Sequence, residues 1–262
     1  MSRLLKGLHF YSSLLGIDGR ATLSTLRHWG GFRRDLAEFK RQRGDDTTFR
    51  AGRLFPVLTD KHAAAGRMKG HYFHQDLYVA RRIYEAKPER HIDIGSRTDG
   101  FVAHLAVFRP VEILDIRALD SRVPNISFRQ ADLMQLPDDL IEATDSVSSL
   151  HAIEHFGLGR YGDPIDYRGH LKALGNIAAM LRRGGTFYFS VPIGPQRVDF
   201  NAHRVFSINY LLALLQPTYD VACFSYVDDA GELFEDVPVD TPAAARNYGC
   251  KFGCGIFVLK KR

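Results

Sequence analysis

The stretch His91-Ile92-Asp93-Ile94-Gly95-Ser96-Arg97-Thr98-Asp99-Gly100 decides the fold class of this chain of 262 residues. Its first four residues have the apolar character of a short strand. Gly95 follows at once, and a glycine there lets the backbone turn tightly and lets a ligand come close. Residues 100–108 then have the pattern of a helix, whose free N–H groups and positive dipole end favour an anion.

The rest of the chain repeats this alternation of strand and helix. Further strands are predicted at residues 111–116, 126–129, 145–150, 186–191, 219–226 and 255–259, and helices at 75–86, 166–181 and 207–215, the last with Ser207 as its N-cap. Strands separated by helices favour right-handed crossovers and a parallel, doubly covered sheet. The last two strands have no predicted helix between them, so an antiparallel pair is expected at that edge.

Acidic residues follow the predicted strands where a ligand would lie. In an open parallel sheet, ligands bind beyond the carboxyl ends of the strands. Asp115 ends the second strand, 22 residues past Asp93, and Asp132 follows the third. A carboxylate in the first place can accept from ribose hydroxyls, and one in the second from an adenine amino group. Their joint placement predicts a nucleotide-type ligand.

The dinucleotide fingerprint G-x-G-x-x-G is absent, because Arg97 stands where its second glycine would be. A pyrophosphate needs that close approach to the backbone, so the sequence disfavours a nicotinamide dinucleotide enzyme. A nucleoside-type ligand without phosphate has less need of that close approach to the loop backbone.

The net charge of +5 is unevenly placed along the chain. Residues 1–55 hold 11 Lys/Arg and 5 Asp/Glu, so this end carries the whole excess. We expect a basic helical arm at residues 1–60 and one domain at residues 61–262. The arm suits an anionic membrane surface or an acidic partner, and a merely solvated helical face is the alternative. Nucleic acid is disfavoured, because the body is not basic.

Three cysteines, Cys223, Cys250 and Cys254, argue against a disulfide framework and suit a reducing compartment. The stretch from Leu8 to Ile17 lacks the features of a signal peptide, and no apolar run approaches the roughly 20 residues of a spanning helix. A cytoplasmic location is expected, with peripheral contact at the inner face of the membrane through residues 1–55.

Residues 150–164 form the densest polar segment. Within it, His151-Ala152-Ile153-Glu154-His155 matches the H-x-x-E-H pattern of inverted zinc peptidases, which leaves a zinc hydrolase as an alternative. That chemistry needs both histidines and the glutamate on one helix face, and this motif instead adjoins a predicted strand end.

The runs Ser149-Leu150-His151-Ala152-Ile153-Glu154-His155, Leu181-Arg182-Arg183-Gly184-Gly185-Thr186 and Val191-Pro192 resemble class I S-adenosylmethionine-dependent methyltransferases. More narrowly, the chain is similar to a domain-of-unknown-function family within that superfamily. That resemblance rests on Gly70-His71-Tyr72-Phe73-His74-Gln75-Asp76, His155-Phe156-Gly157-Leu158-Gly159-Arg160-Tyr161-Gly162-Asp163-Pro164 and Phe200-Asn201-Ala202-His203-Arg204-Val205-Phe206. It covers about residues 60–262.

The resemblance implies a Rossmann-like α/β fold with a seven-stranded sheet in the order 3-2-1-4-5-7-6, strand 7 antiparallel. It implies S-adenosyl-L-methionine as the cofactor and His151 beside the sulfonium. The residues expected at the cofactor are Asp93, Gly95, Ser96, Arg97, Gly100, Asp115, Ile116, Asp132, Leu133 and His151. Arg97 and Asp99 replace glycines of the usual loop, and Arg97 either pairs with the cofactor carboxylate or points to solvent.

Methyl transfer to a hydroxyl needs a base, and the candidates are His155 and His203, with Asp163 as an alternative. A histidine after the fourth strand also commonly orients a loop. The acceptor hypothesis is a sugar hydroxyl on a surface glycan or its lipid-linked precursor, lined by residues 157–166 and 71–74. A non-catalytic binding module is the alternative function. The sequence leaves regiochemistry and oligomeric state open, and no metal ligands are assigned.

Overall fold

The computed structural model describes residue 16, residues 19–49 and residues 52–262. The chain divides into two compact units, Met1–Arg67 and Met68–Arg262. The first unit contains helix α2 (Gly19–Arg43) and the short 3-10 turn η1 (Asp60–His62). The basic arm expected over residues 1–60 falls in this unit, and its residues 1–15, 17–18 and 50–51 lie outside the described residues.

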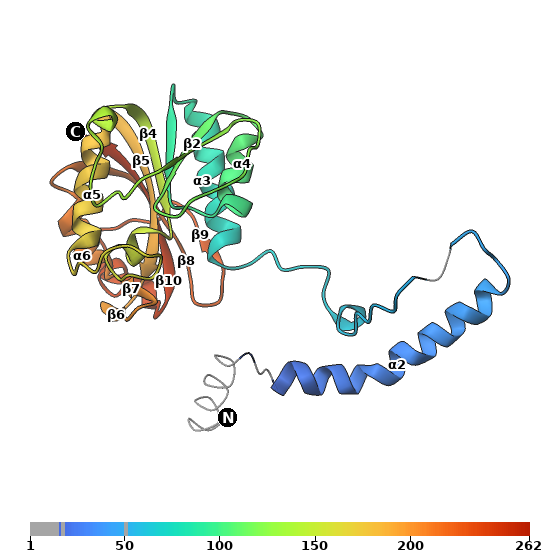
Figure 1. Ribbon diagram of the computed structural model, residues 1–262. Coiled ribbons are helices and arrows are strands. Elements are labelled where there is room, and N and C mark those ends of the chain that lie inside the picture. The colour runs from blue at the N-terminus through green and yellow to red at the C-terminus, as the bar shows by residue number, and fades with distance from the viewer. Residues whose placement is uncertain (1–15, 17–18, 50–51) are drawn as a thin grey trace. The chain divides into compact units, whose positions relative to one another are not determined.

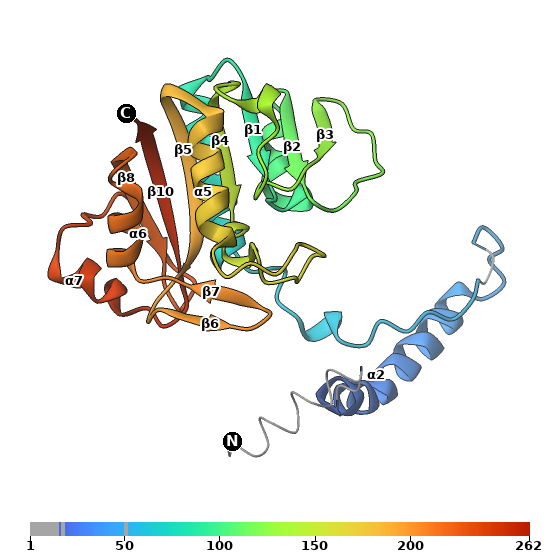
Figure 2. The same cartoon turned by 60° about the vertical axis from the view of Figure 1, so that its left-hand side comes forward.

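The second unit is built on an eight-stranded sheet in the order β3-β2-β1-β4-β5-β10-β8-β9 (Figures 1 and 2). Its strands are β1 (His91–Ile94), β2 (Val111–Asp115), β3 (Ile126–Gln130), β4 (Thr144–Leu150), β5 (Leu181–Ile193), β8 (Tyr219–Val227), β9 (Leu233–Phe234) and β10 (Gly253–Lys261). The order confirms the predicted arrangement, with β10 as the antiparallel seventh strand. The two-residue edge strand β9 is an addition that the sequence pattern did not predict.

Helices cover both faces of this sheet. Helices α5 (Gly169–Met180) and α6 (Ile208–Leu215) lie on one face, and α3 (His71–Ala86) and α4 (Ala103–Ala106) lie on the other (Figures 1 and 2). Ser207 caps α6 as predicted, because its side chain accepts from the backbone N–H of Tyr210. The remaining elements are the hairpin β6 (Arg197–Asp199) and β7 (His203–Val205), helix α7 (Pro242–Ala245), the π-helical turn η2 (Thr98–Val102), and the 3-10 turns η3 (Asp138–Leu140), η4 (Ile153–His155) and η5 (Asn247–Gly249).

The helix predicted over residues 100–108 differs from the observed one. It begins as the π-helical turn η2, in which the Val102 N–H donates to the Arg97 carbonyl over five residues at 3.3 Å. Gly100 permits this path beside α3, because a Cβ there would lie 2.5 Å from the Asp76 carboxylate. The α-helical part is therefore only the four residues of α4.

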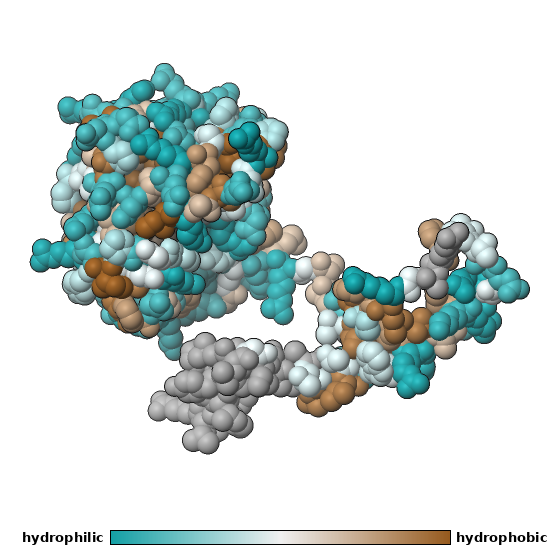
Figure 3. All heavy atoms as spheres, viewed as in Figure 1, coloured by the Kyte–Doolittle hydropathy of each residue, from teal (hydrophilic) through white to brown (hydrophobic). Residues whose placement is uncertain are grey.

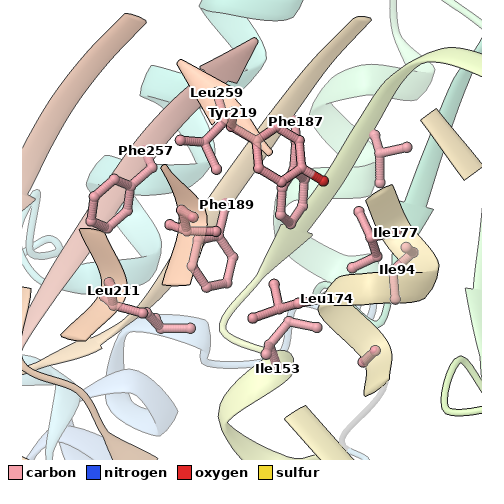
Figure 4. Close-up of a cluster of buried hydrophobic side chains, with 14 of the residues drawn as sticks. Ile94, Ile153, Leu174, Ile177, Phe187, Phe189, Leu211, Tyr219, Phe257 and Leu259 are labelled. Carbon is pink, nitrogen blue, oxygen red and sulfur yellow. The ribbon is translucent and has the colours of Figure 1, made fainter. Parts of the chain in front are cut away.

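Alternating side chains divide the core into two layers. Phe187, Phe189 and Phe257 pack toward α5 and α6, whereas Tyr188 and Ile256 pack toward α3. This follows from the pleat of the strands, which sends successive side chains to opposite faces. Because these apolar groups lie inside, hydrophilic residues cover most of the face of the second unit seen in Figure 3, and Figure 4 shows the layer beneath α5 and α6.

None of the helices among the described residues combines the length and the apolar character that crossing a bilayer requires.

Phe189 offers a direct test of the first core layer, because its ring is fully buried between Phe187 and Phe257. Phe189→Ala is expected to lower the free energy of unfolding by about 3–5 kcal/mol, through lost burial and the cavity left behind. Val107→Ala is the matched control, since Val107 is 84% exposed, and should change it by no more than about 0.5 kcal/mol. Urea unfolding followed by fluorescence and circular dichroism measures both. Equal stability of the two variants would contradict this packing.

Candidate functional site

A cleft of about 510 Å³ opens at the carboxyl ends of β1, β2 and β4. A smaller hollow of about 70 Å³ shares several lining residues with it, Asp115 and His151 among them. The cleft is lined chiefly by polar and aromatic residues, namely His71, Tyr72, Gly95, Ser96, Arg97, Asp99, Asp115, Arg117, His151, Glu154, His155, Arg160, Tyr161, His203 and Phe252. This is the edge at which an open parallel sheet binds ligands.

The glycine turn that opens the cleft has the geometry that the sequence predicts. Gly95 has a φ of +67°, which a side chain rarely permits. A Cβ at this position would also stand 3.1 Å from that of Ala152. Its N–H donates to the Leu114 carbonyl at 3.0 Å, which ties the turn to β2. The turn therefore brings the backbone of Gly95 and Ser96 to the cleft wall.

Asp93 lies beneath the cleft and does not line it. Its carboxylate is fully buried, and it accepts from the hydroxyls of Ser96 and Ser148 at 2.6 and 2.5 Å and from the Ser96 N–H at 3.1 Å. Burial raises the pKa of Asp93 to about 6, although these bonds oppose the rise. The structure thus gives Asp93 the task of holding the loop, where a cofactor contact was expected. Gly100, also expected at the cofactor, packs against Asp76 and lines neither hollow.

Asp115 faces both hollows, as the offset from Asp93 predicts. Arg117 pairs with it through two bonds, Nε to Oδ1 at 3.0 Å and Nη2 to Oδ2 at 2.7 Å. The Arg117 guanidinium also lies 4.4 Å from the ring centroid of Tyr161. Arg117 was not predicted as a site residue, and Tyr161 was expected only as part of residues 157–166 at the acceptor, because only the folded loop brings residue 161 back over the end of β2.

The smaller hollow, which is called the slot below, has a mostly apolar lining with some polar side chains. Ile116, Asp132 and Leu133 line it, as expected, together with Phe156. Asp132 accepts from the Met134 N–H through Oδ1 at 2.9 Å, which fixes its loop. Such a slot suits a flat heterocycle with an exocyclic amino group.

Arg97 lies on the cleft wall in place of the usual glycine. Its guanidinium donates to the Asp99 carboxylate at 3.1 and 3.0 Å and sits 4.8 Å from the ring centroid of Tyr72. Of the two alternatives for this residue, the structure shows a side chain held at the cleft and paired with its neighbour.

His151 and Glu154 form a buried pair at the floor of the cleft. His151 Nδ1 lies 2.9 Å from Glu154 Oε1, and His151 has a φ of 50°, an uncommon conformation for a side chain of its size. Burial opposes charge on both groups. The neighbouring Cys254 sulfur and Glu154 nevertheless raise the pKa of His151 well above its ordinary value, and His151 in turn lowers the pKa of Glu154. Both shifts favour the ion pair, with the proton on His151 and not on Glu154.

His155 is arranged to accept a proton. Its Nδ1 lies 2.7 Å from the Ala202 carbonyl oxygen, and because a carbonyl only accepts, Nδ1 carries the hydrogen. Burial lowers the pKa of His155, and Glu154 opposes this shift. The ring is therefore neutral at pH values above 6.5, the ordinary pKa of a histidine. Its Nε2 then holds a lone pair, 3.7 Å from Glu154 Oε1.

The other two catalytic candidates occupy different settings. His203 lines the cleft, with Nε2 at 3.4 Å from Asp199 Oδ2 and its ring 4.9 Å from that of Phe252. Asp163 instead accepts from the backbone N–H groups of residues 157, 159 and 161 at 2.7, 3.2 and 3.2 Å. Both of its oxygens are engaged, so the structure replaces the expected base role of Asp163 by one of organising this loop.

The zinc arrangement suggested by the H-x-x-E-H pattern is not formed. Residues 153–155 make a 3-10 turn shortly after the end of β4, and one nitrogen of each imidazole approaches Glu154 Oε1, at 2.9 Å from His151 and 3.7 Å from His155. Among the described residues, no group of three or more His, Cys, Asp or Glu side chains could hold a metal ion.

The first turn of α3 forms one wall of the cleft. The His71 ring stacks on that of His151 at 5.3 Å and 15°, and the Tyr72 ring lies 5.3 Å from it as well. Both belong to the 71–74 cluster proposed from the sequence as part of the acceptor site. Phe252 packs against His71 from the segment before β10. No motif marked Phe252, because the strand order alone brings the end of the chain to this cleft.

Solved structures with a similar fold include methyltransferases. An N1-methyltransferase of 1,6-didemethyltoxoflavin from Burkholderia thailandensis, with that compound and S-adenosylhomocysteine bound, has a TM-score of 0.51 at 16% identity, over 71% of this chain and 78% of that one. The N-methyltransferase NodS of Bradyrhizobium japonicum, in complex with S-adenosyl-L-homocysteine, has a TM-score of 0.49 at 14% identity, over 73% and 88%. At such identity the first likeness shows the class I methyltransferase fold.

The profile of the family described as "Caenorhabditis protein of unknown function, DUF268" matches residues 110–245, and the chain belongs to this family. None of the curated proteins matches the sequence significantly.

The bonds of Asp163 predict a structural effect. Asp163→Ala should lower the free energy of unfolding by about 1.5–3 kcal/mol, because it leaves loop N–H groups without their charged acceptor. It should also speed trypsin cleavage after Arg160, which lies inside the loop. Asp120→Ala, at an exposed carboxylate, is the control. Unchanged stability and unchanged cleavage would show that the loop does not depend on Asp163.

Proposed function

We propose that this protein is an S-adenosylmethionine-dependent methyltransferase that methylates a sugar hydroxyl of a surface glycan or its precursor. The observation that carries the proposal is the position of His155, a neutral base with a free Nε2, in the same cleft as Gly95 and Asp115. A nucleotide-type site and a proton acceptor thus share one hollow, which is what transfer to a hydroxyl requires.

The residues of the cleft fit the cofactor. A volume of about 510 Å³ suits a ligand of that size. Asp115 can accept from ribose hydroxyls while it keeps Arg117, since a carboxylate offers about four lone-pair sites. Leu133 and Phe156 can enclose the adenine, with Asp132 at its amino edge. The backbone at Gly95 and Ser96 and the guanidinium of Arg97 suit the amino-acid end.

S-adenosylmethionine, when bound, supplies an electrophilic methyl group and becomes S-adenosylhomocysteine once the methyl passes to the acceptor oxygen. His155 takes the hydroxyl proton at Nε2. Glu154, 3.7 Å from this nitrogen, stabilises the imidazolium that results. His151 keeps Glu154 ionised, because the pair stabilises both charges. Much of the acceleration comes from holding the acceptor in line with the methyl group.

The combination of aromatic and polar residues in the cleft lining supports a sugar as the acceptor. His71, Tyr72 and Phe252 contribute aromatic rings to this lining, and Arg160 and His203 contribute polar groups. A few fixed polar groups among aromatic surfaces can orient a polyhydroxylated ring. Arg160 also donates to the Ala202 carbonyl at 2.8 Å, the same oxygen that holds His155. Arg160 of the proposed acceptor site and the proposed base His155 thus bind the same carbonyl oxygen, that of Ala202.

The role of Asp115 can be measured without knowledge of the acceptor. Asp115→Ala should weaken binding of S-adenosylhomocysteine by about 10- to 100-fold, the loss expected for hydrogen bonds to a charged group. Isothermal titration measures it, with Asp139→Ala as the control, because Asp139 pairs with Arg129 outside the lining of the cleft. Equal affinity of the two variants would place the nucleotide elsewhere.

The role of His155 predicts a rate loss and a pH profile. His155→Ala should reduce turnover by about 10²–10⁴-fold with little change in S-adenosylhomocysteine affinity. A base must be neutral, so wild-type activity should be complete above the lowered pKa of His155 and fall as pH drops through it, below 6.5. Release of S-adenosylhomocysteine with a panel of glycosides and glycolipids measures both. If His203→Ala removes this acid limb and His155→Ala keeps it, His203 is the base.

A cofactor-binding module without turnover is the second candidate. The Arg97–Asp99 pair favours it, since it occupies the wall where methyltransferases of this class carry glycines. Binding of S-adenosylmethionine without release of the product on any acceptor of the panel would favour the module. Absence of binding at millimolar ligand would count against both candidates.

A further inference from the structure

Helix α2 of the first unit exposes large apolar side chains along one side. Leu26, Trp29 and Phe39 are 69%, 41% and 63% exposed. They lie with Phe32 and Leu36 at spacings of three or four residues, so all five fall on one side of the helix. The described residues of the first unit leave this side of the helix uncovered, and an uncovered apolar surface of this kind marks an interaction site.

The opposite side of α2 carries arginines. Arg27, Arg34 and Arg41 recur every seven residues, which is close to two helical turns, so they form a row away from the apolar side. The helix holds seven Lys/Arg and two Asp/Glu, a net charge of +5. Among the described residues, Arg41 is the one arginine of this row that pairs with a carboxylate, that of Glu38 at 2.5 Å. The row is therefore a mostly uncompensated positive surface.

The described residues of the first unit make few contacts with α2. Lys61 bonds Asp35 at 2.7 Å, and residues 56–59 lie beside Thr25 and Trp29. Gly30 and Gly31 stand in the middle of the helix, where glycine is among the least favourable residues. Helices in proteins owe most of their stability to the packing of an apolar side. A partner on that side would therefore also hold α2 in its helical form.

Charge decides between the occupants of this side. A second copy of α2 would bring two helices of +5 together, and like charges oppose that association. An anionic lipid surface attracts the same charge and accepts Leu, Trp and Phe side chains at the headgroup boundary. We propose that α2 binds the surface of an anionic phospholipid bilayer, with its apolar side in the interface and its arginines reaching phosphate groups. This inference does not rest on the proposed methyltransferase activity.

Co-sedimentation of the full-length protein with vesicles tests the proposal. Vesicles of phosphatidylcholine alone are compared with vesicles that contain phosphatidylglycerol as well. We expect binding to the anionic vesicles that falls with salt and is far weaker on neutral ones. Leu26→Glu/Phe39→Glu should weaken it more than about tenfold, through lost apolar burial. Arg27→Glu/Arg34→Glu should weaken it by a similar factor, since each basic residue near the surface contributes.

Matched controls separate this surface from a general effect of charge. Val107→Glu/Tyr167→Glu adds the same two charges at positions of the second unit that are 84% and 81% exposed, and it should bind as the wild type does. Gly31→Ala has open space for its methyl group and improves helix propensity. It should bind more tightly and raise the helical circular dichroism that vesicles induce.

Several results would overturn the proposal. One is wild-type protein that stays in the supernatant with anionic vesicles. Another is unchanged binding by Leu26→Glu/Phe39→Glu, which would mean attraction without insertion. A third is sedimentation velocity showing a wild-type dimer that this variant dissolves, which would make a second copy the occupant. S-adenosylhomocysteine titration of the same variants should remain unchanged, so failure here is distinguishable from failure of the catalytic proposal.

Discussion

The hydrogen bonds of the buried Asp93 carboxylate are the interaction on which the rest of the site depends. Asp93 joins three segments, since it lies in β1, binds Ser96 of the glycine turn and binds Ser148 of β4. The Ser96 hydroxyl then accepts from the Leu150 N–H at 3.0 Å, just before His151. A buried carboxylate is costly unless hydrogen bonds replace its lost hydration. The fold therefore requires the loop after β1 and the loop after β4 to keep one fixed geometry, and the cleft lies between them.

His151 and Glu154 follow the segment that Asp93 and Ser96 hold in place, and both have unusual features. His151 takes a left-handed backbone conformation, and its Nε2 and the Glu154 Oε2 have no partner although both are buried. Such strain and unmet bonding persist where the surrounding structure holds them in place, and they mark functional sites. His155 shares Glu154 but takes its own orientation from Ala202. Glu154 thus lies between two histidines whose pKa values shift in opposite directions, upward for His151 and downward for His155. Such a pair of environments favours a charged ring at one position and a neutral ring at the other.

The fold followed from the sequence to a large extent. Strand positions and the Ser207 cap come from local patterns, and the antiparallel pair came from the missing helix between the last strands. The order of the strands in the sheet came from the resemblance to class I methyltransferases. The exceptions have local causes too. Gly100 allows a π-helical turn beside Asp76, and the edge strand β9 is only two residues long. The placement of the basic arm at the start of the chain was equally plain from charge, although its lipid partner remains a proposal.

For the site, the sequence by itself determined which loops meet, because parallel strands deliver their carboxyl ends to one edge. It could not determine which acidic group faces the ligand. Asp93 and Asp115 both lie near the carboxyl ends of strands, yet Asp93 is buried among serines and Asp115 opens to the cleft. Register between β1 and β4 sets Asp93 opposite Ser148, and that pairing is not local in sequence. Arg117, Tyr161 and Phe252 reach the cleft for the same reason. Only the tertiary structure decided these contacts, since a hydrogen bond or a stacked ring depends on distance in space and not on spacing along the chain.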